Sequence, residues 1–140
     1  MPTTGRREEV RLLGVTVPEL LAKLRADPRL SGLADLVTGG PKDVWGLRAA
    51  ARACGLGQTQ LNVQLRRVTG LTCHQLRTRL RVLQALSLLR EPDARLIDVC
   101  FDAGFGSIPS FYRSFARLMG VPPSSLRARP VFSRRRNANS

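Results

Sequence analysis

The chain has 140 residues, of which 43% are hydrophobic, so it can bury a core and is not a disordered chain. Its formal net charge of +13 and its sequence pI of about 11.6 indicate a polyanionic partner such as nucleic acid. No apolar signal segment opens the sequence and no run approaches the ~18 apolar residues of a membrane span, so we expect a soluble, cytoplasmic protein without a membrane partner.

The first part of the chain carries little pattern beyond two short helices. Residues 1–16 are charged and predict a tail or a linker remnant. Residues 17–27 predict a helix with three leucines on one side. Asp27-Pro28 should end that helix, because a residue before proline is pushed out of the helical region. A second short helix is expected over residues 29–37, before a loop rich in glycine.

From about residue 44 the chain repeats itself with an offset of about 50 residues. Each copy predicts a short helix, a turn at a glycine that takes a positive φ, and a second helix with apolar residues at i and i+4. This is the outline of a helix-turn-helix. The second helix should begin near residue 58 in the first copy and after Ser107, a favourable N-cap, in the second. The matched positions are Ala51 and Cys100, Gly55 and Gly104, Leu61 and Phe111, and Leu65 and Phe115.

The strongest helical pattern lies between the two copies, over about residues 74–90, with leucines at helical spacing. A helix of about 17 residues is about 25 Å long. Successive major grooves on one face of B-form DNA are about 34 Å apart. We therefore expect this helix to hold two recognition helices so that they enter successive major grooves.

The second copy carries a more specific pattern. It reads Ile97-x-Val99-Cys100-x-x-x-Gly104-Phe105, then Phe111-x-Arg113-x-Phe115, then Gly120-Val121-x-Pro123-x-x-x-Arg127. This pattern resembles the DNA-binding domain of the AraC/XylS family of bacterial transcription regulators. The run Arg81-Val82-Leu83-Gln84-Ala85-x-x-Leu88-Leu89 is similar to the family's middle helix. The resemblance implies an all-α fold of about seven helices, with two helix-turn-helix subdomains joined by a central linker helix.

The resemblance also implies a division of the chain. Residues 29–130 would form the DNA-binding domain, with helix-turn-helix motifs at about 48–69 and 96–119. Residues 1–28 would be an N-terminal tail or short helix, and residues 131–140 a basic disordered tail.

Four positions depart from the family's usual pattern. Val63 stands where the family often places a base-contacting arginine, and Leu65 where an aromatic residue is common. Cys100 replaces an alanine, and Ala116 replaces a frequent basic residue. The first motif is therefore expected to be the weaker reader of DNA sequence.

Side chains on the second helix of each motif, polar or basic except for Ile108, are the candidates for DNA contact. Asn62 could bond adenine bidentately, the Thr59 methyl could meet a thymine methyl, and Arg113 could bond guanine, the commonest specific pairing. The other arginines are assigned to phosphates, although all these side chains could also be ordinary solvated helix faces. The candidates are Gln58, Thr59, Asn62, Arg66 and Arg67 in the first motif, and Ile108, Ser110, Tyr112, Arg113 and Arg117 in the second.

The sequence thus predicts a transcription regulator, an activator or a repressor, that binds double-stranded promoter DNA. RNA polymerase is a second candidate partner, and the oligomeric state stays open, a monomer being compatible with the pattern. The alternatives are a degenerate helix-turn-helix module for protein interaction and a non-specific architectural DNA binder. No enzymatic activity, cofactor or metal is expected: the chain has one histidine, and Cys73-His74 lacks the spacing of a ligand set.

Overall fold

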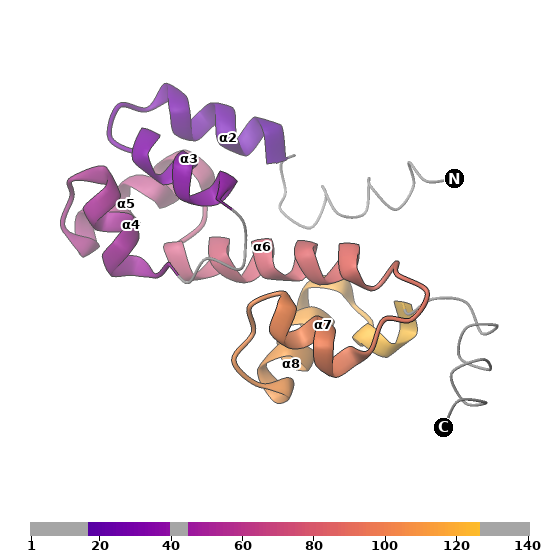
Figure 1. Ribbon diagram of the computed structural model, residues 1–140. Helices are drawn as coiled ribbons and strands as arrows, with labels where there is room; N and C mark the ends of the chain where they lie inside the picture. The colour runs from indigo at the N-terminus through magenta and orange to yellow at the C-terminus, as the bar shows by residue number, and fades with distance from the viewer. Residues whose placement is uncertain (1–16, 40–44, 127–140) are drawn as a thin grey trace, which may run out of the picture. The chain divides into compact units, whose positions relative to one another are not determined.

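The computed structural model describes residues 17–39 and 45–126, which form helices joined by turns and loops (Figure 1). These residues form seven α-helices and one 3-10 helix and contain no strand, which confirms the predicted all-α fold. The chain divides into two compact units, Met1–Leu80 (unit 1) and Arg81–Ser140 (unit 2). The helices are α2 (Val17–Ala26), α3 (Ser31–Thr38), α4 (Leu47–Cys54), α5 (Gln58–Thr69), α6 (Cys73–Leu88), α7 (Leu96–Asp102) and α8 (Ile108–Met119), followed by η1 (Pro123–Leu126).

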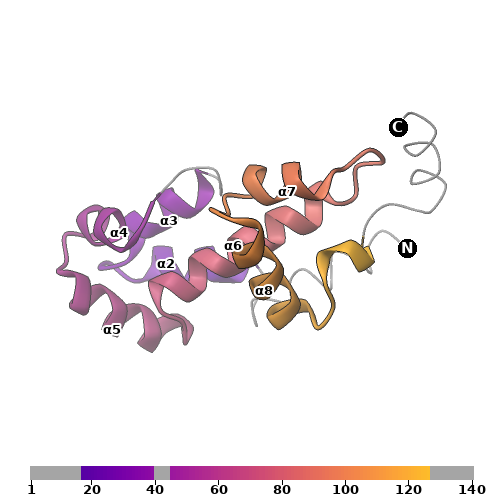
Figure 2. The ribbon, with the colours of Figure 1, turned by 90° about the horizontal axis from the view of Figure 1, so that it is seen from below.

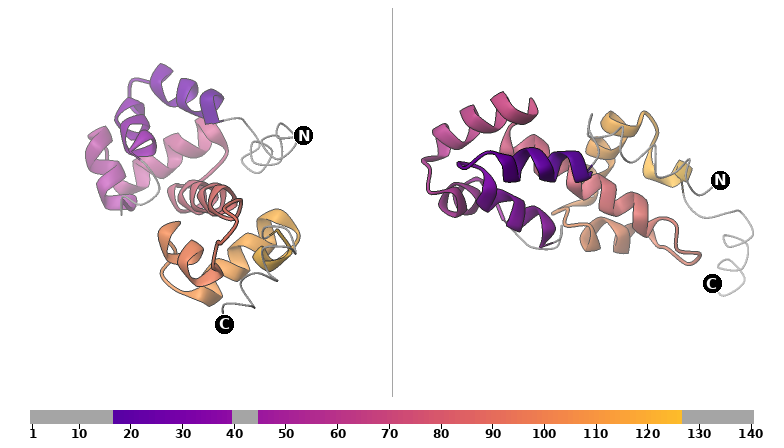
Figure 3. Two further views of the ribbon diagram at one scale, coloured as in Figure 1. Left: turned by 45° about the vertical axis from the view of Figure 1, so that its right-hand side comes forward. Right: turned by 90° about the horizontal axis from the view of Figure 1, so that it is seen from above.

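Helix α2 forms part of the core of unit 1. Its apolar stripe buries Leu20 and Leu24 completely, as the leucine spacing predicts. The helix packs against α3 and α5, and the view from above shows it lying between them (Figure 3, right). Residues 17–26 therefore contribute to the same core as the first helix-turn-helix motif, although the resemblance to the family begins only at residue 29.

The turn between α2 and α3 is organised by Asp27. Its Oδ1 accepts a hydrogen bond from the backbone N–H of Arg29 (2.8 Å), and its carbonyl oxygen accepts one from Leu30 (2.9 Å). These bonds hold residues 27–30 in a turn, so α3 begins at Ser31 and not at residue 29. The Asp27 Oδ2 atom also accepts a hydrogen bond from Gln64 Nε2 (2.6 Å), which ties this turn to α5.

Helix α6 confirms the predicted linker helix with a shift of one or two residues at each end. It begins with a reciprocal capping box, in which Gln75 Oε1 accepts from the Thr72 N–H (2.9 Å) and Thr72 Oγ1 accepts from the Gln75 N–H (3.2 Å). The division between the two units falls inside this helix, after Leu80.

Unit 2 is built on an aromatic cluster. The rings of Phe105 and Phe111 lie 5.1 Å apart, and those of Phe111 and Phe115 lie 5.9 Å apart in an edge-to-face arrangement. All three side chains are buried. The apolar spacing of Phe111 and Phe115 in the second helix is therefore confirmed as a buried face, to which Phe105 adds a third ring.

Candidate nucleic-acid interface

The two copies of the sequence repeat have the same backbone conformation at the turn between their helices. Helix α4 ends at Gly55, whose φ is +67°, and the next residue's N–H bonds the Ala51 carbonyl at 2.9 Å. Helix α7 is followed by Gly104 at a φ of +100°, and the next N–H bonds the Cys100 carbonyl at 3.0 Å. Both turns thus stop the first helix with a left-handed glycine and lead directly into the second, as Figure 2 shows for α4 and α5.

The two second helices begin with different caps. In α8 the Ser107 side chain accepts a hydrogen bond from the N–H of Ser110 at 3.3 Å, which confirms the predicted cap. In α5 the N-cap is Gly57, which has no side chain to offer, and the Gln60 Oε1 atom accepts from the Gly57 N–H instead (3.0 Å). The second motif is therefore better capped than the first.

Both second helices bury one face and expose the other in the same register. Each has 12 residues and ends at a left-handed glycine, with a φ of +81° at Gly70 and +80° at Gly120. Helix α5 buries Leu61 and Leu65, and α8 buries the matching pair Phe111 and Phe115. A residue midway between the members of such a pair lies on the opposite side of the helix.

The residues at these midpoints are Val63 in α5 and Arg113 in α8. Both are exposed, and Val63 retains 52% of its accessible surface. Each therefore stands at the centre of the outward face of its helix. A guanidinium group occupies this place in the second motif and an isopropyl group occupies it in the first.

The structure exposes some of the candidate contact residues of α8 more than others. Arg113 and Arg117 are exposed, one turn apart on the outer face. Ile108, Ser110 and Tyr112 are half-buried, and the Tyr112 ring packs edge-on against Phe111 at 5.7 Å. The two arginines, which are the only charged residues of α8, are thus both accessible.

In α5, the outer face carries the exposed residues Gln58, Thr59, Arg66 and Arg67. Asn62 is half-buried, and its Oδ1 atom accepts a hydrogen bond from the backbone N–H of Cys73 at 2.9 Å. Bidentate recognition of adenine needs both the acceptor and the donor of the amide. The Asn62 acceptor is instead engaged at the start of α6.

Two glutamines of α5 also form hydrogen bonds within unit 1. Gln60 bonds the N-cap residue of its own helix, and Gln64 bonds Asp27. Three of the four amide side chains of α5 thus form hydrogen bonds within unit 1. Sequence reasoning missed the roles of Asn62 and Gln64, because their partners, 11 and 37 residues away, are brought to them by the fold.

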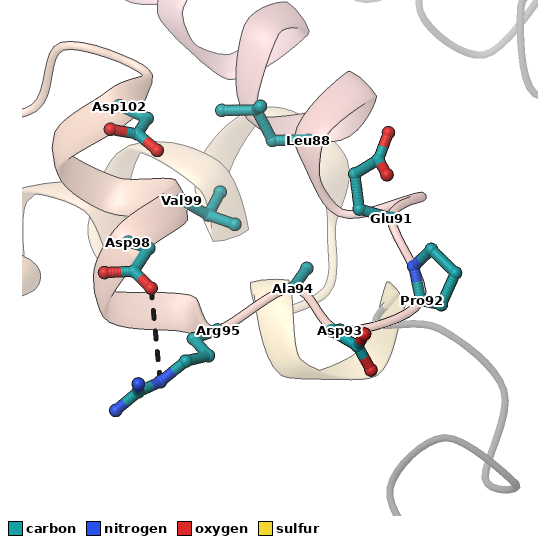
Figure 4. A pocket seen from close by; sticks show the side chains of 9 residues that line it. All are labelled: Leu88, Glu91, Pro92, Asp93, Ala94, Arg95, Asp98, Val99 and Asp102. Carbon is teal, nitrogen blue, oxygen red and sulfur yellow. Dashed lines mark ion pairs between the residues drawn. The ribbon is translucent and has the colours of Figure 1, made fainter. Parts of the chain in front are cut away.

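Charge is strongly segregated along the helix-turn-helix region. From residue 44 to the end of the chain, every acidic residue lies between positions 91 and 102. All four line one hollow of about 260 Å³ in unit 2, between the loop after α6 and helix α7 (Figure 4). Arg95 lines the same hollow, and its Nε atom lies 4.0 Å from Asp98 Oδ2. The four are Glu91, Asp93, Asp98 and Asp102, and no residue of α8 lines the hollow.

The described part of the chain offers little other site chemistry. Over residues 17–39 and 45–126, no three His, Cys, Asp or Glu side chains are placed to hold a metal ion. Within the same ranges, no helix is both long and apolar enough to cross a membrane. Burial raises the pKa of the Cys100 thiol above its ordinary value, and its Sγ lies 3.5 Å from the Ser107 carbonyl oxygen. Burial likewise raises the pKa of Cys54 and of Cys73.

Two consecutive helix-turn-helix motifs, in a strongly basic chain, define a tandem helix-turn-helix protein of the DNA-binding class. Residues 50–129, more than half of the chain, match the helix-turn-helix domain family. The chain belongs to this AraC-type family of DNA-binding transcription regulators, which is not an enzyme family. A search of the curated proteins found no match.

Proposed function

We propose that the protein is a sequence-specific regulator that inserts α5 and α8 into successive major grooves of double-stranded promoter DNA. The observation that carries the proposal is the position of Arg113, exposed at the centre of the outward face of α8 and opposite the buried phenylalanines. The major groove admits an α-helix, and its base edges then face the outward side of that helix.

Arg113 is the proposed base-reading residue of the second motif. Arginine can donate two parallel hydrogen bonds to the O6 and N7 atoms of guanine, which no other base pair offers in the same arrangement. The neighbouring position one turn on is Ala116, which is small and exposed and does not crowd the guanidinium. We therefore assign guanine recognition to Arg113.

The arginines near the ends of the two helices are proposed to bind phosphates. Arg66, Arg67 and Arg117 lie in the last turns of α5 and α8 and are exposed. Contacts to phosphate fix the register of the protein on the duplex and supply affinity that depends on salt, without reading sequence. Arg67 and Arg117 occupy matching positions of the repeat, so they should contribute alike.

The acidic hollow of unit 2 is proposed to face away from the duplex. Carboxylates repel the phosphate backbone, and the hollow is formed by the α6–α7 loop and α7, without any residue of the recognition helix α8. We further infer that the protein works in the bacterial cytoplasm, as an activator or as a repressor. RNA polymerase stays a candidate partner, and a monomer a compatible state.

Fluorescence anisotropy with a labelled duplex that carries the protein's selected site tests the assignment of Arg113. Arg113→Ala should weaken binding to that site by about 1–3 kcal/mol and remove the preference for guanine at one position. Arg117→Ala should weaken binding to all duplexes alike and lower the slope of log K against log salt by about 0.9. Arg95→Ala, which removes the same charge beside the acidic hollow, serves as the control. An Arg113→Ala variant that binds its site as the unaltered protein does would refute the assignment.

A second candidate function is protein interaction through unit 2. Ile97 and Phe101 lie one turn apart on α7, and each retains 51% of its accessible surface. DNA binding through α8 gives these two apolar side chains no role. Weak, salt-insensitive binding to any duplex would favour this second function over the first.

A further inference from the structure

We propose that Val63 is a base-reading residue that recognises the C5 methyl group of a thymine in the groove entered by α5. The proposal rests on the function proposed above. It assigns sequence recognition to the first motif through an apolar contact, where the second motif uses a guanidinium.

The exposure of Val63 is the first observation. The side chain is 52% exposed and lies midway between the buried Leu61 and Leu65, so it projects from the centre of the outer face. It holds the same place in α5 that Arg113 holds in α8. If α8 presents Arg113 to the bases, the shared register presents Val63 to the bases of the first groove.

The residues around Val63 are the second observation. Its neighbours one turn away in either direction are Thr59, Gln60, Arg66 and Arg67, and all four are exposed. An isolated valine within such a polar ring has no apolar neighbour on its own helix face with which to form a larger hydrophobic patch. The arrangement suits a single methyl-sized contact inside a polar groove.

The hydrogen bonds of α5 are the third observation. The residues on either side of Val63 are held inside unit 1, Asn62 by the Cys73 N–H and Gln64 by Asp27. Gln60 caps the start of its own helix. These bonds fix the rotation of α5 and engage three of its four amide side chains; the fourth, the exposed Gln58, lies five residues before Val63.

The chemistry of the groove then selects the base. Thymine is the only one of the four DNA bases that presents a methyl group in the major groove. An isopropyl group facing guanine would cover the N7 and O6 acceptors without offering a hydrogen bond, which costs free energy. When the isopropyl group of Val63 faces thymine, its methyl groups pack against the C5 methyl group of the base and bury it. The protein should therefore prefer thymine at the base pair below Val63 and guanine at the one below Arg113.

Replacing thymine by deoxyuridine tests this directly, because the exchange removes only the C5 methyl. Each thymine of the selected duplex is replaced in turn, and the dissociation constant is measured by anisotropy. One replacement should weaken binding by the unaltered protein about fourfold, which corresponds to about 0.8 kcal/mol for one buried methyl group. In Val63→Ala, the ratio between the thymine and uracil duplexes at that position should fall toward one.

Thr59→Ser is the matched control, because it removes the other methyl group on this face of α5 and keeps the hydroxyl. In this variant, the ratio of the dissociation constants for the uracil and thymine duplexes should be unchanged at the base pair that Val63 faces. The side chain of Val63 is exposed, so Val63→Ala should fold normally, which the fluorescence of the buried Trp45 can verify.

Two results would overturn the proposal and are distinguishable. In the first result, the selected duplex is bound, but the preference for thymine over uracil is unchanged in Val63→Ala or is lost only in Thr59→Ser. Val63 then does not recognise the methyl group, whereas the proposed DNA-binding function stands. If no duplex is bound in preference to any other, this proposal falls together with the proposed function.

Discussion

Replacing Gly32 by alanine should destabilise unit 1 although it places a better helix former inside α3. A Cβ atom at position 32 would overlap the carbonyl oxygen of Ala53 and lie 2.8 Å from its carbonyl carbon. Both are backbone atoms of α4, so no side chain can move aside to make room. Helices α3 and α4, which pack directly together, would have to separate.

Two opposing effects set the size of the change in the free energy of unfolding. Alanine is favoured over glycine inside a helix by about 1 kcal/mol. Overpacking a tight contact costs about 1–3 kcal/mol, and a clash with backbone belongs at the upper end of that range. The net destabilisation should therefore be about 2 kcal/mol, equivalent to a fall in Tm of about 10 °C for a unit of this size.

Thermal and urea unfolding followed by tryptophan fluorescence would measure the effect. Trp45 is the only tryptophan of the chain and is buried in the core of unit 1, so it reports on that unit. Gly106→Ala, which lies in unit 2 and is followed by circular dichroism, is the control, since an added Cβ there meets nothing within 4 Å. A Gly32→Ala variant at least as stable as the unaltered protein would show that α3 and α4 do not approach as closely as described, and would refute the reasoning.

Three further predictions concern the caps, the thiols and the acidic hollow. Ser107→Ala should lower the free energy of unfolding by about 1 kcal/mol in urea, because it removes the side-chain cap of α8. Gly57→Ser should raise the free energy of unfolding by a few tenths of a kcal/mol, because it gives α5 such a cap. If both substitutions changed the free energy of unfolding in the same direction, the difference in capping would be contradicted. Burial raises the pKa of each thiol above its ordinary value of 9.0, so the thiolate fraction at pH 7.5 should be small and the reaction with a disulfide reagent slow. The reaction rate should rise as the pH approaches and passes 9, and the half-buried Cys54 should react before the buried Cys73 and Cys100. Rapid labelling of Cys100 in the folded protein would count against its burial. The double variant Asp98→Asn, Asp102→Asn should raise the affinity for every duplex by less than about threefold at 0.15 M salt. The reason is that charges farther than about 8 Å from the phosphates are screened. A larger gain, or one that depends on the DNA sequence, would place the hollow against DNA.

Local patterns in the sequence were sufficient to predict most of the helices. The glycine turns at Gly55 and Gly104 and the serine cap of α8 depend on residues close together in the chain, and all three are confirmed. The buried leucines and phenylalanines follow from helical spacing and are confirmed as well. These features were predictable because their physical causes lie within one or two helical turns.

Contacts between distant segments were not predictable in the same way. Nothing in the sequence around Asn62 shows that its side chain would accept a hydrogen bond from Cys73, or that Asp27 would bind Gln64. The predicted start of α3 at residue 29 is two residues too early, because the sequence pattern does not show that Asp27 holds residues 27–30 in a turn. The DNA-contacting roles of the exposed residues stay predictions, since burial and hydrogen bonding determine which side chains are available but not which base each one meets.

In vitro selection of bound duplexes from a random library, performed with the full chain, would show whether α5 and α8 read sequence in successive grooves. We expect one enriched sequence made of two blocks about one helical turn apart, with thymine specified in one block and guanine in the other. Binding to it should weaken steeply as salt increases. Recovery of no common sequence, or of binding that does not change with salt, would contradict this expectation.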